Sequence, residues 1–597
     1  MFPPMSFVRE HARWLLLAVA AVVLVVHSLA YNFVTDDAYI SFVFSRNLAE
    51  HGQLSFNLGD PVEGYTNFLW TVLLGLGMLL GIPPELSSRV LGAACALGTL
   101  YVVFRVTERA LGRRSAWAAV PALLLASSSG FACWTSGGLE TQLFTLLVVI
   151  ALDGVVAAAD DPRALRRAAL ALALSAMTRP EGLLVAGLLG IVHIVGRVLR
   201  RDGRGVRDEV IAAACFLAVW APWFAWRAWY YGHLWPNTYY VKASGRWSDP
   251  RFELEMAKNG AHYLWVWATQ TRVVLVLPLL VVGLVAGAAT RARVVLAMAC
   301  TLIGIVYLSY VVTVGGDFMG LHRFVMPVFV LAAIALTLGL EYLASAPLSA
   351  RIRAFVIIGT ALGVGRAAGI VTRVFATSHA SALWPWSNRR LLAAVFLTLV
   401  AALLFIPDRR RSLRAVVAAA LVVGGFAAGQ YALTRTSTRF GNNTPDRGID
   451  TPAFLMVYTE DRAAIGRAME PCFRPDDFSI VGGAGAQPYY GRMRAIDVFG
   501  LVSERIAHEE PRIRPRAGHT KFGNDRLLAD YDPTFVFSCY AIHDKPTPQP
   551  RLPCAGFWLA RGYEQVTMRI PGMRQQGEYY TFLAKKDRAF QCPGRVP

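Results

Sequence analysis

The stretch YNFVTDDAYISFVFSRNLAEHGQLSFNLGDPVEGYTNFLW, residues 31–70, directly follows the first apolar run of the chain, Trp14 to Ala30. This order places two adjacent carboxylates, Asp36 and Asp37, at the boundary between membrane and water. Charged groups at that depth are costly unless they face protein or a water-filled cavity. An ordinary outer loop is the alternative interpretation, but the density of carboxylates and aromatic rings in the stretch favours a functional site.

The residues after the acid pair predict helices that lie at the membrane surface. In AYISFVFSRNLAEHG, Ile40, Phe44 and Leu48 are spaced for one face of a short amphipathic helix. The next apolar run, Thr66 to Gly81, is shorter than the roughly 20 residues that a spanning helix needs. We therefore expect residues 34–83 to form a first extracytoplasmic loop with in-plane or re-entrant juxtamembrane helices.

The composition is that of a multi-pass membrane protein. Of the 597 residues, 55% are hydrophobic, the mean hydropathy is +0.42, and apolar runs of spanning length recur as far as Leu433. Counting every run predicts thirteen spans, and dropping two weak ones predicts eleven; the irregular runs include Ala354 to Phe375 and Leu391 to Ile406. The net charge of +19 comes from arginines in short loops between spans, which is a topology signal and argues against a nucleic-acid partner.

Loop composition predicts the orientation. An odd number of spans, with arginine-rich loops inside, places the N-terminus in the cytoplasm and the tail outside a bacterial plasma membrane. We expect Ala116 to Trp134 to be one outward span, and Gly232 to Thr271 to be a long outer loop. The loops assigned to the outside carry the acids, amides and aromatic residues: Asp36 and Asp37, Glu63, Glu140, Arg179 and Glu181, residues 237–242, and residues 317–323. The chemistry is therefore expected on the extracytoplasmic side.

The tail, residues 434–597, is predicted to be a separate soluble α/β domain following a membrane domain of residues 1–433. Short strand-like runs such as TFVFSCY and YTFLAKK alternate with turns. Four of the eight cysteines lie here, and they favour two disulfides, of three possible connectivities, over a zinc site, because the tail has no CxxC pair: Cys472, Cys539, Cys554 and Cys592. The glycine-rich GGAGAQ run, residues 482–487, lacks the spacing of a phosphate-binding loop and is interpreted as a turn.

The motif order Asp-Asp, AYISF, RNLAE, LSFN and EGYTNFLWT after the first span resembles the membrane-embedded GT-C glycosyltransferases. Within them it is similar to the mycobacterial AftB-type terminal β-(1→2)-arabinofuranosyltransferases, and a related N-terminal module occurs in ZomB. The resemblance implies an integral membrane α-helical GT-C fold of about 11–13 transmembrane helices. It also implies transfer of arabinofuranose from decaprenylphosphoryl-arabinose to terminal positions of the arabinan in arabinogalactan and lipoarabinomannan. Such a β-configured donor and β-linked product imply net retention, whereas a simple displacement inverts the anomeric centre.

Transfer from a lipid phosphate needs a base for the acceptor hydroxyl and cations for the leaving phosphate. Asp36 or Asp37 is the expected catalytic base, because two neighbouring carboxylates do not both ionise cheaply in a low-dielectric site; one of the two is equally expected to cap the following helix. The expected donor-phosphate ligands are His322, Arg323, Lys242 and Arg179. The expected substrate-binding residues are Glu63, Tyr65, Asn67, Glu140, Asn237, Tyr239 and Asp317. The competing interpretations are a snorkelling arginine, an interfacial aromatic belt and local ion pairs.

No nucleotide-binding loop and no spaced set of metal ligands is present, so the sequence predicts neither a cofactor nor an essential metal. The expected partners are the polyprenyl-phosphate sugar, an arabinan acceptor and the lipid bilayer, with the protein acting as a monomer. One alternative is another polyprenyl-phosphate-sugar transferase, of the mannosyl or ZomB type. A lipid-linked sugar transporter would show inverted repeats, and none is evident. A non-catalytic scaffold would tolerate neutralisation of both aspartates.

Overall fold

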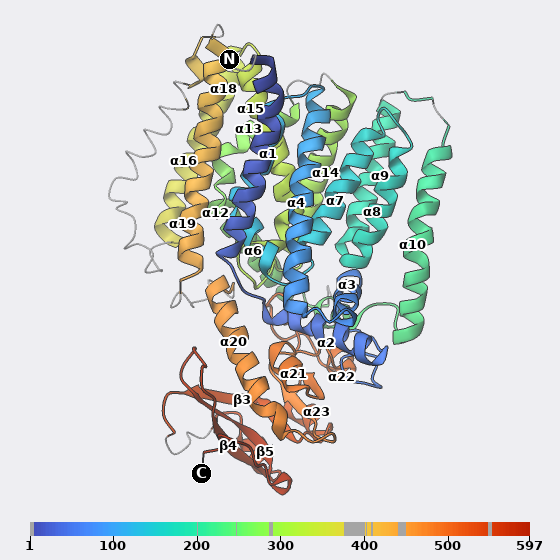
Figure 1. The fold of residues 1–597 in the computed structure, drawn as a ribbon, viewed down its shortest axis with the longest axis vertical. Helices are drawn as coiled ribbons and strands as arrows, with labels where there is room; N and C mark the ends of the chain where they lie inside the picture. Colours follow the sequence, from blue (N-terminus) through green and yellow to red (C-terminus); the bar gives the residue numbers. More distant parts are fainter. Residues whose placement is uncertain are drawn as a thin grey trace.

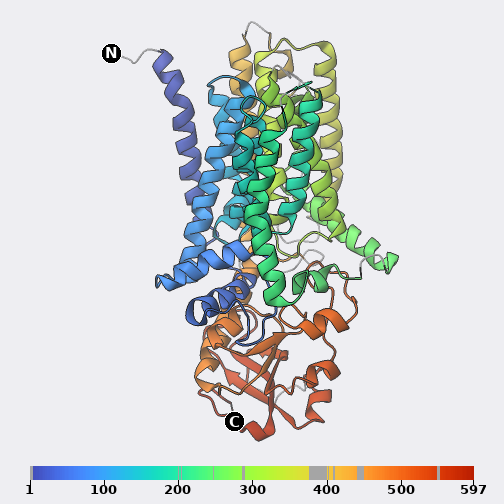
Figure 2. The same cartoon turned by 90° about the vertical axis from the view of Figure 1, so that its right-hand side faces the viewer.

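The computed structural model of the chain is an upright bundle of helices with a smaller domain, containing a β-sheet, at one end (Figures 1 and 2). The structure describes residues 5–596 except 200, 204, 246–247, 286–289, 375–399, 401–402, 408–409, 440–448 and 547–551. The N-terminal helix starts at the far end of the bundle from the sheet, and the C-terminus lies in the sheet domain.

Within these described residues, seven helices are long and apolar enough to cross a membrane, and two bent pairs raise the number to nine. The seven involve α1 (Met5–Leu29), α4 (Pro84–Leu111), α9 (Glu181–Leu199), α10 (Arg207–Tyr231), α14 (Arg291–Thr313), η2 with α15 (Arg323–Val325, Met326–Ser345), and the segment Leu413–Ser437 that ends in α19 (Gly425–Ser437). The protein is therefore a multi-pass membrane protein. The predicted count of 11 to 13 also included shorter runs, which form α7 (Thr141–Ala157) and α8 (Ala164–Thr178) inside the bundle. Ala354 to Phe375 falls mostly in α16 (Ala350–Val374), and most of Leu391 to Ile406 lies outside the described residues.

Two segments differ from the predicted topology because the chain bends sharply. The expected single span Ala116 to Trp134 is bent by 66° between α5 (Val120–Ser127) and α6 (Ser129–Ser136). Ser128 stands at the bend with extended backbone, and its hydroxyl accepts a hydrogen bond from the amide of Phe131, so it starts a new helix. A serine within an apolar run lowers the hydropathy little, which is why the break was missed.

The expected long outer loop from Gly232 to Thr271 is mostly helical, and that prediction was wrong. It contains α11 (Asn237–Lys242) and α12 (Pro250–Gln270), and α12 meets α13 (Val273–Val285) at an angle of 86°. The mixed polar and apolar sequence of α12 hides it from a hydropathy scan. The local signals were present, however, because Asp249 caps the helix through the amides of Arg251 and Phe252 and a proline occupies its first turn.

The juxtamembrane segment forms α2 (Asp36–His51) and α3 (Phe68–Leu79), which pack together beneath the bundle (Figure 1). The hydroxyl of Ser45 donates hydrogen bonds to the carbonyls of Ser41, in its own helix, and Thr71, in α3. Gly52 ends α2 in the left-handed conformation. The carboxylates of Asp36 and Asp37 are thereby fixed in the first turn of a buried helix, which favours negative charge.

The C-terminal domain contains a five-stranded mixed sheet of order β2-β1-β3-β5-β4. The strand β1 (Ser479–Val481) pairs in parallel with β2 (Ala495–Asp497) and β3 (Phe535–His543), whereas β5 (Tyr579–Lys585) runs antiparallel to β3 and to β4 (Tyr563–Arg569). Its helices are α20 (Pro452–Met469), α21 (Ala486–Gly491), α22 (Glu504–Glu509), α23 (Asp525–Ala529) and α24 (Gly556–Leu559). The prediction of two disulfides is confirmed, with the connectivity Cys472–Cys592 and Cys539–Cys554.

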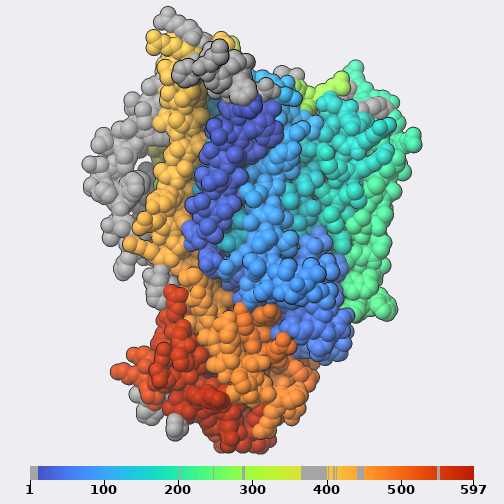
Figure 3. Space-filling view, viewed as in Figure 1, coloured from blue at the N-terminus to red at the C-terminus, as the bar shows by residue number. Residues whose placement is uncertain are grey.

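This domain is docked on the juxtamembrane segment (Figure 3). Arg46 of α2 donates to the carbonyl of Tyr489, and the hydroxyl of Tyr490 donates to Glu85 at the start of α4. On the other side, Met319 pairs through its backbone with Asp450, just before α20. The sheet domain therefore covers the segment that carries the two aspartates.

Candidate active site

Asp36 opens α2 and is held by the C-terminal domain. Its carboxylate accepts a hydrogen bond of 2.8 Å from the backbone amide of Ala486. Burial raises the pKa of Asp36 to about 6, against the opposing effect of the Ala486 hydrogen bond and the charge of Arg462. This carboxylate is thus occupied by protein contacts.

The contact to Asp36 requires glycine. A Cβ atom built on Gly485 would lie 2.1 Å from the carbonyl oxygen of Asp36 and 2.4 Å from its carboxyl carbon, closer than real Cβ contacts come. The GGAGAQ run was interpreted as a turn, and Gly485 in this run allows the backbone to contact Asp36 directly. Sequence reasoning did not assign Gly485, Ala486 or Arg462 to the site. The signal was the glycine-rich run itself, but a partner 450 positions away is not visible in the sequence.

Asp37 faces a different group of side chains, at the membrane side of α2. Within the part of the chain that the structure describes, its carboxylate has no hydrogen-bond or ion-pair partner. Burial raises the pKa of Asp37, the charges of Arg323 and Lys242 lower it, and those of Asp317 and Glu140 raise it again. The backbone therefore directs the two neighbouring aspartates into separate environments.

Two arginines of this group, Arg323 beside Asp37 and Arg179 near Arg323 and Lys242, are held by acids and by aromatic rings. Arg323, at the start of η2, donates to Asp317, and its guanidinium lies over the rings of Trp134 and Phe324. Arg323 comes directly after a strained turn. Leu321 and His322 both have a φ of 58°, a left-handed conformation that is unfavourable for residues other than glycine. Strained backbone of this kind is common where a side chain must be aimed at a functional site.

The second arginine, Arg179, joins three elements. It donates a 2.7 Å hydrogen bond to Glu140, at the N-terminus of α7, and pairs with Glu181 at 3.1 Å. Glu140 in turn accepts a 3.0 Å hydrogen bond from the amide of Asn67, which also bonds with Ser41 of α2. The structure thus brings together Asn67, Glu140 and Arg179, which the sequence had placed on three separate loops.

Lys242, the last residue of α11, is the third cation near Asp37. Its side chain reaches solvent, yet desolvation by the surrounding protein lowers the pKa of the ammonium. The negative charge of Asp37 opposes this effect. Its ammonium makes no hydrogen bond or ion pair to the described residues. Lys242 is placed by Asn237, whose amide donates to the carbonyls of Gly500 at 2.7 Å and Leu501 at 2.9 Å in the C-terminal domain.

Four of the expected substrate ligands have their polar groups directed elsewhere. Glu63 is buried and forms a forked ion pair with Arg227 of α10. The hydroxyl of Tyr65 bonds with that of Tyr231 at 2.9 Å. Asn237 serves the domain contact described above, and Tyr239 is exposed, with its ring tilted against that of Trp235 at a centroid distance of 5.4 Å. These contacts position α10, α11 and the loop before α3 around the site.

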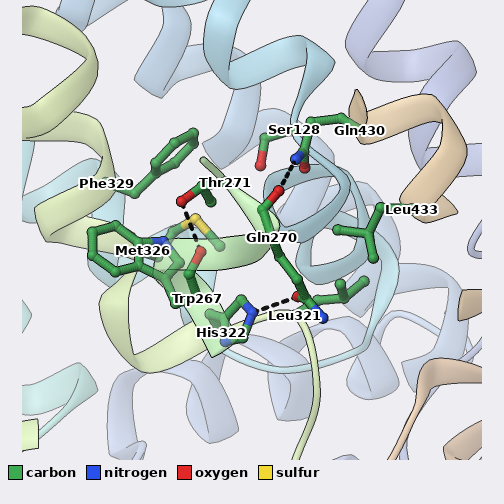
Figure 4. Close-up of a pocket in the computed structure, with 11 residues that line it drawn as sticks. Ser128, Trp267, Gln270, Thr271, Leu321, His322, Met326, Phe329, Gln430 and Leu433 are labelled. Atoms are coloured by element: carbon green, nitrogen blue, oxygen red, sulfur yellow. Dashed lines mark hydrogen bonds between the residues drawn. The ribbon is translucent and has the colours of Figure 1, made fainter. Parts of the chain in front are cut away.

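His322 also lies in surroundings unlike those expected of a phosphate ligand. It lines a small cavity and bonds with Gln270 at 2.6 Å (Figure 4). Apolar side chains such as Trp267, Met326 and Phe329 line this cavity. Burial lowers the pKa of His322 to about 3, so the ring is neutral at physiological pH. Of the adjacent pair, Arg323 is the residue that offers a positive charge to a phosphate.

The site therefore combines one carboxylate that is free of hydrogen bonds to the described residues, Asp37, with three cationic side chains, Arg179, Arg323 and Lys242. A carboxylate of raised pKa accepts a proton well, and a guanidinium or ammonium stabilises a phosphate. This arrangement suits transfer of a group from a phosphate to a hydroxyl.

Part of the chain is similar to a known enzyme in sequence. It is 28% identical over 270 residues to the terminal β-(1→2)-arabinofuranosyltransferase of Mycobacterium tuberculosis, and the match covers 42% of each chain. The match thus spans less than half of the length of this curated relative. Residues 455–583, in the C-terminal domain, match the family model described as a domain of unknown function, DUF8728.

The fold is similar to that of a solved structure. ArnT from Cupriavidus metallidurans, bound to undecaprenyl phosphate, superposes over 96% of this chain and 98% of its own, with a TM-score of 0.55 and 15% identity. The arabinosyltransferase EmbB from Mycobacterium smegmatis is a more distant neighbour, with a TM-score of 0.42, 15% identity and coverage of 72% and 42%. The likeness to ArnT confirms the predicted GT-C fold, with its membrane helices and C-terminal sheet domain.

Proposed function

We propose that the protein is a membrane glycosyltransferase that moves arabinofuranose from decaprenylphosphoryl-arabinose to the ends of cell-wall arabinan, in a β-(1→2) linkage. The observation that carries this proposal is the carboxylate of Asp37, which has no hydrogen bond to the described residues and lies near Arg323 and Lys242. The sugar and the linkage rest on the similarity to the mycobacterial enzyme. The lipid donor is supported by the shared fold with ArnT, whose structure contains undecaprenyl phosphate.

In the proposed reaction, Asp37 takes the proton from the acceptor hydroxyl as its oxygen forms a bond to the anomeric carbon, on the face that the phosphate leaves, so that the β configuration is retained. The bond from that carbon to the phosphate oxygen breaks, and polyprenyl phosphate leaves with the electron pair. Arg323 and Lys242 stabilise the charge that develops on this phosphate. The ion pairs of Arg179 with Glu140 and Glu181 hold the wall of the site in place, and Asp36 fixes the first turn of α2.

We further propose that the site faces the extracytoplasmic side of the bacterial plasma membrane. The basic loops support this orientation. The two disulfides support it independently, because disulfides persist in oxidising compartments and the disulfide-bonded domain is the one that contacts Asp36.

The test is arabinosyl transfer from decaprenylphosphoryl-arabinose to a synthetic arabinan acceptor by purified protein. We expect Asp37→Asn to lower kcat by about 10²-fold to 10⁴-fold, because the amide does not accept the proton. Asp36→Asn should lose less, since an amide oxygen still accepts the Ala486 hydrogen bond. Glu50→Gln is the control, because it neutralises an exposed carboxylate on the same helix.

Each outcome of this assay has a defined meaning. Full activity of Asp37→Asn would remove it as the base. Transfer of mannose in preference to arabinose would reassign the donor and keep the site. A β-linked product would support this retaining step, and an α-linked product would indicate a backside displacement, which inverts the anomeric centre.

A further inference from the structure

Three possible metal ligands gather where the chain leaves α10 and meets the C-terminal domain. His233 follows Gly232, which ends α10 in the left-handed conformation, and Glu504 and His508 belong to α22. The ligand atoms of these three side chains all lie within 4.8 Å of one another. His233 Nε2 is 2.6 Å from a carboxylate oxygen of Glu504, and the two imidazole rings are 5.0 Å apart.

The local structure explains why these residues meet. Glu504 and His508 are four positions apart on a helix, so they project from the same face. The ring of Tyr240 packs 4.1 Å from that of His508 and limits the directions in which His508 can turn. The nearby carboxylate of Asp60 adds negative charge, since it interacts with Glu504 electrostatically.

We propose that His233, Glu504 and His508 bind a divalent transition metal ion of the zinc type. Two imidazoles and one carboxylate are the donor set that zinc prefers, whereas magnesium and calcium prefer all-oxygen sets. Zinc lies about 2.0–2.2 Å from nitrogen and oxygen ligands in a tetrahedral site, so its ligand atoms are about 3.5 Å apart. The His233–Glu504 contact of 2.6 Å would therefore open slightly, and the wider separations of up to 4.8 Å would close by about 1 Å. Their exposure makes both that rotation and entry of the ion feasible.

A simple hydrogen bond between His233 and Glu504 does not account for the cluster. An exposed pair of this kind contributes little to stability, and it does not explain why a ring nitrogen of His508 also lies within 4.8 Å of the two groups. A bound ion would use all three groups. It would also connect the segment that leads to α11, which carries Lys242, to the C-terminal domain. A catalytic benefit of this connection rests on the proposed function, whereas the metal site itself does not.

The test uses the full-length protein in detergent, stripped with a chelator and then titrated with Zn²⁺ alone by calorimetry and by thermal unfolding. We expect saturable binding that raises Tm, because an ion that binds only the folded state stabilises it. Mg²⁺ and Ca²⁺ at the same concentration should leave Tm unchanged. His508→Gln should weaken Zn²⁺ binding by at least about tenfold, since even loss of an outer-shell partner has such an effect.

His51→Gln is the matched control, because His51 is also an exposed histidine beside a carboxylate, at the end of α2. It should bind Zn²⁺ as the parent protein does. Absence of saturable Zn²⁺ binding by the parent protein would overturn the proposal, as would equal binding by His508→Gln. The Zn²⁺ titration of the parent protein tests the proposal even if His508→Gln does not fold. In that case His233→Gln and Glu504→Gln are used in place of His508→Gln.

Discussion

Asp36 and Asp37 show how one peptide bond separates two chemical environments. The carboxylate of Asp36 is buried and bonded to the amide of Ala486. That of Asp37 lies among the charges of Arg323, Lys242, Asp317 and Glu140. Consecutive side chains on a helix point about 100° apart, so each aspartate meets a different part of the protein.

Replacing Lys242 by methionine should move the acidic limb of the pH–activity profile to higher pH, by up to about one unit. Lys242 lowers the pKa of Asp37, so its removal makes Asp37, the proposed base, retain its proton to higher pH. Activity therefore falls at pH values within and below the acidic limb. The plateau at high pH changes only because phosphate is bound more weakly. Lys242→Arg keeps the charge and should leave the limb in place; a limb unaffected by Lys242→Met would contradict the assignment of Asp37.

The pKa of Asp36, raised from 3.8 to about 6, makes stability depend on pH. The folded state binds this proton more tightly than the unfolded state, so stability is lost as pH rises from about 4 to about 6. The loss amounts to about 3 kcal/mol for a shift of this size. Asp36→Asn should remove this component, which unfolding of both proteins across pH 4–7 would measure. Parallel curves for the two proteins would show that Asp36 does not titrate in this range.

At the scale of elements, the decisive contact is between the first turn of α2 and the turn that leads into α21. The backbone of Gly485 packs directly on Asp36. The positive charge of Arg462, in α20, interacts electrostatically with the Asp36 carboxylate. Arg462 is itself held between the rings of Tyr540 and Tyr458, at 4.3 and 4.9 Å. This packing couples the C-terminal domain to the helix that carries Asp37.

Gly485→Ala should separate these two elements. The added methyl group has no room against the backbone of Asp36, so we expect a destabilisation of about 1–3 kcal/mol and a fall in activity. Gly482→Ala, three residues earlier in the same turn, is the control, since a Cβ there meets no atom within 4 Å. Thermal unfolding and transferase activity of the two variants would be compared. Equal behaviour of both variants would argue against the contact.

At the scale of the whole molecule, the membrane bundle and the sheet domain share one site. Lys242 and Asp37 belong to the membrane side, whereas Ala486 and the carbonyls that anchor Asn237 belong to the C-terminal domain. The disulfide Cys472–Cys592 ties the end of α20 to the C-terminal segment across 120 residues. The stability of the domain is therefore expected to limit the activity of the whole protein.

Removing this long-range disulfide should cost more than removing the short one. Constraint of the unfolded chain predicts about 5 kcal/mol for the Cys472–Cys592 loop and about 3 kcal/mol for the Cys539–Cys554 loop, whose cysteines are 15 residues apart. Double serine variants of each pair, compared by urea unfolding of the full chain, would measure the difference. A larger loss for the short loop would indicate that native-state packing, and not loop length, dominates.

The accuracy of sequence-based prediction here followed the range of the interactions. Hydropathy identified the membrane domain, and the four tail cysteines indicated two disulfides, because these depend on local composition. Polar α12 and the bend at Ser128 were missed, because a hydropathy window averages over both. Arg179, Arg323 and Lys242 were named from their loops, but nothing local distinguished them from Glu63 or His322, whose partners are Arg227 and Gln270.

By itself, the sequence determined a membrane protein with an acid pair at the end of its first span and a disulfide-bonded tail. Only the tertiary structure decided which aspartate remains without hydrogen bonds to the described residues and what holds the other. The physical reason is that hydropathy and helix signals act over a few residues. The hydrogen bond from Ala486 to Asp36, in contrast, spans 450 positions and exists only once the tail has docked on α2.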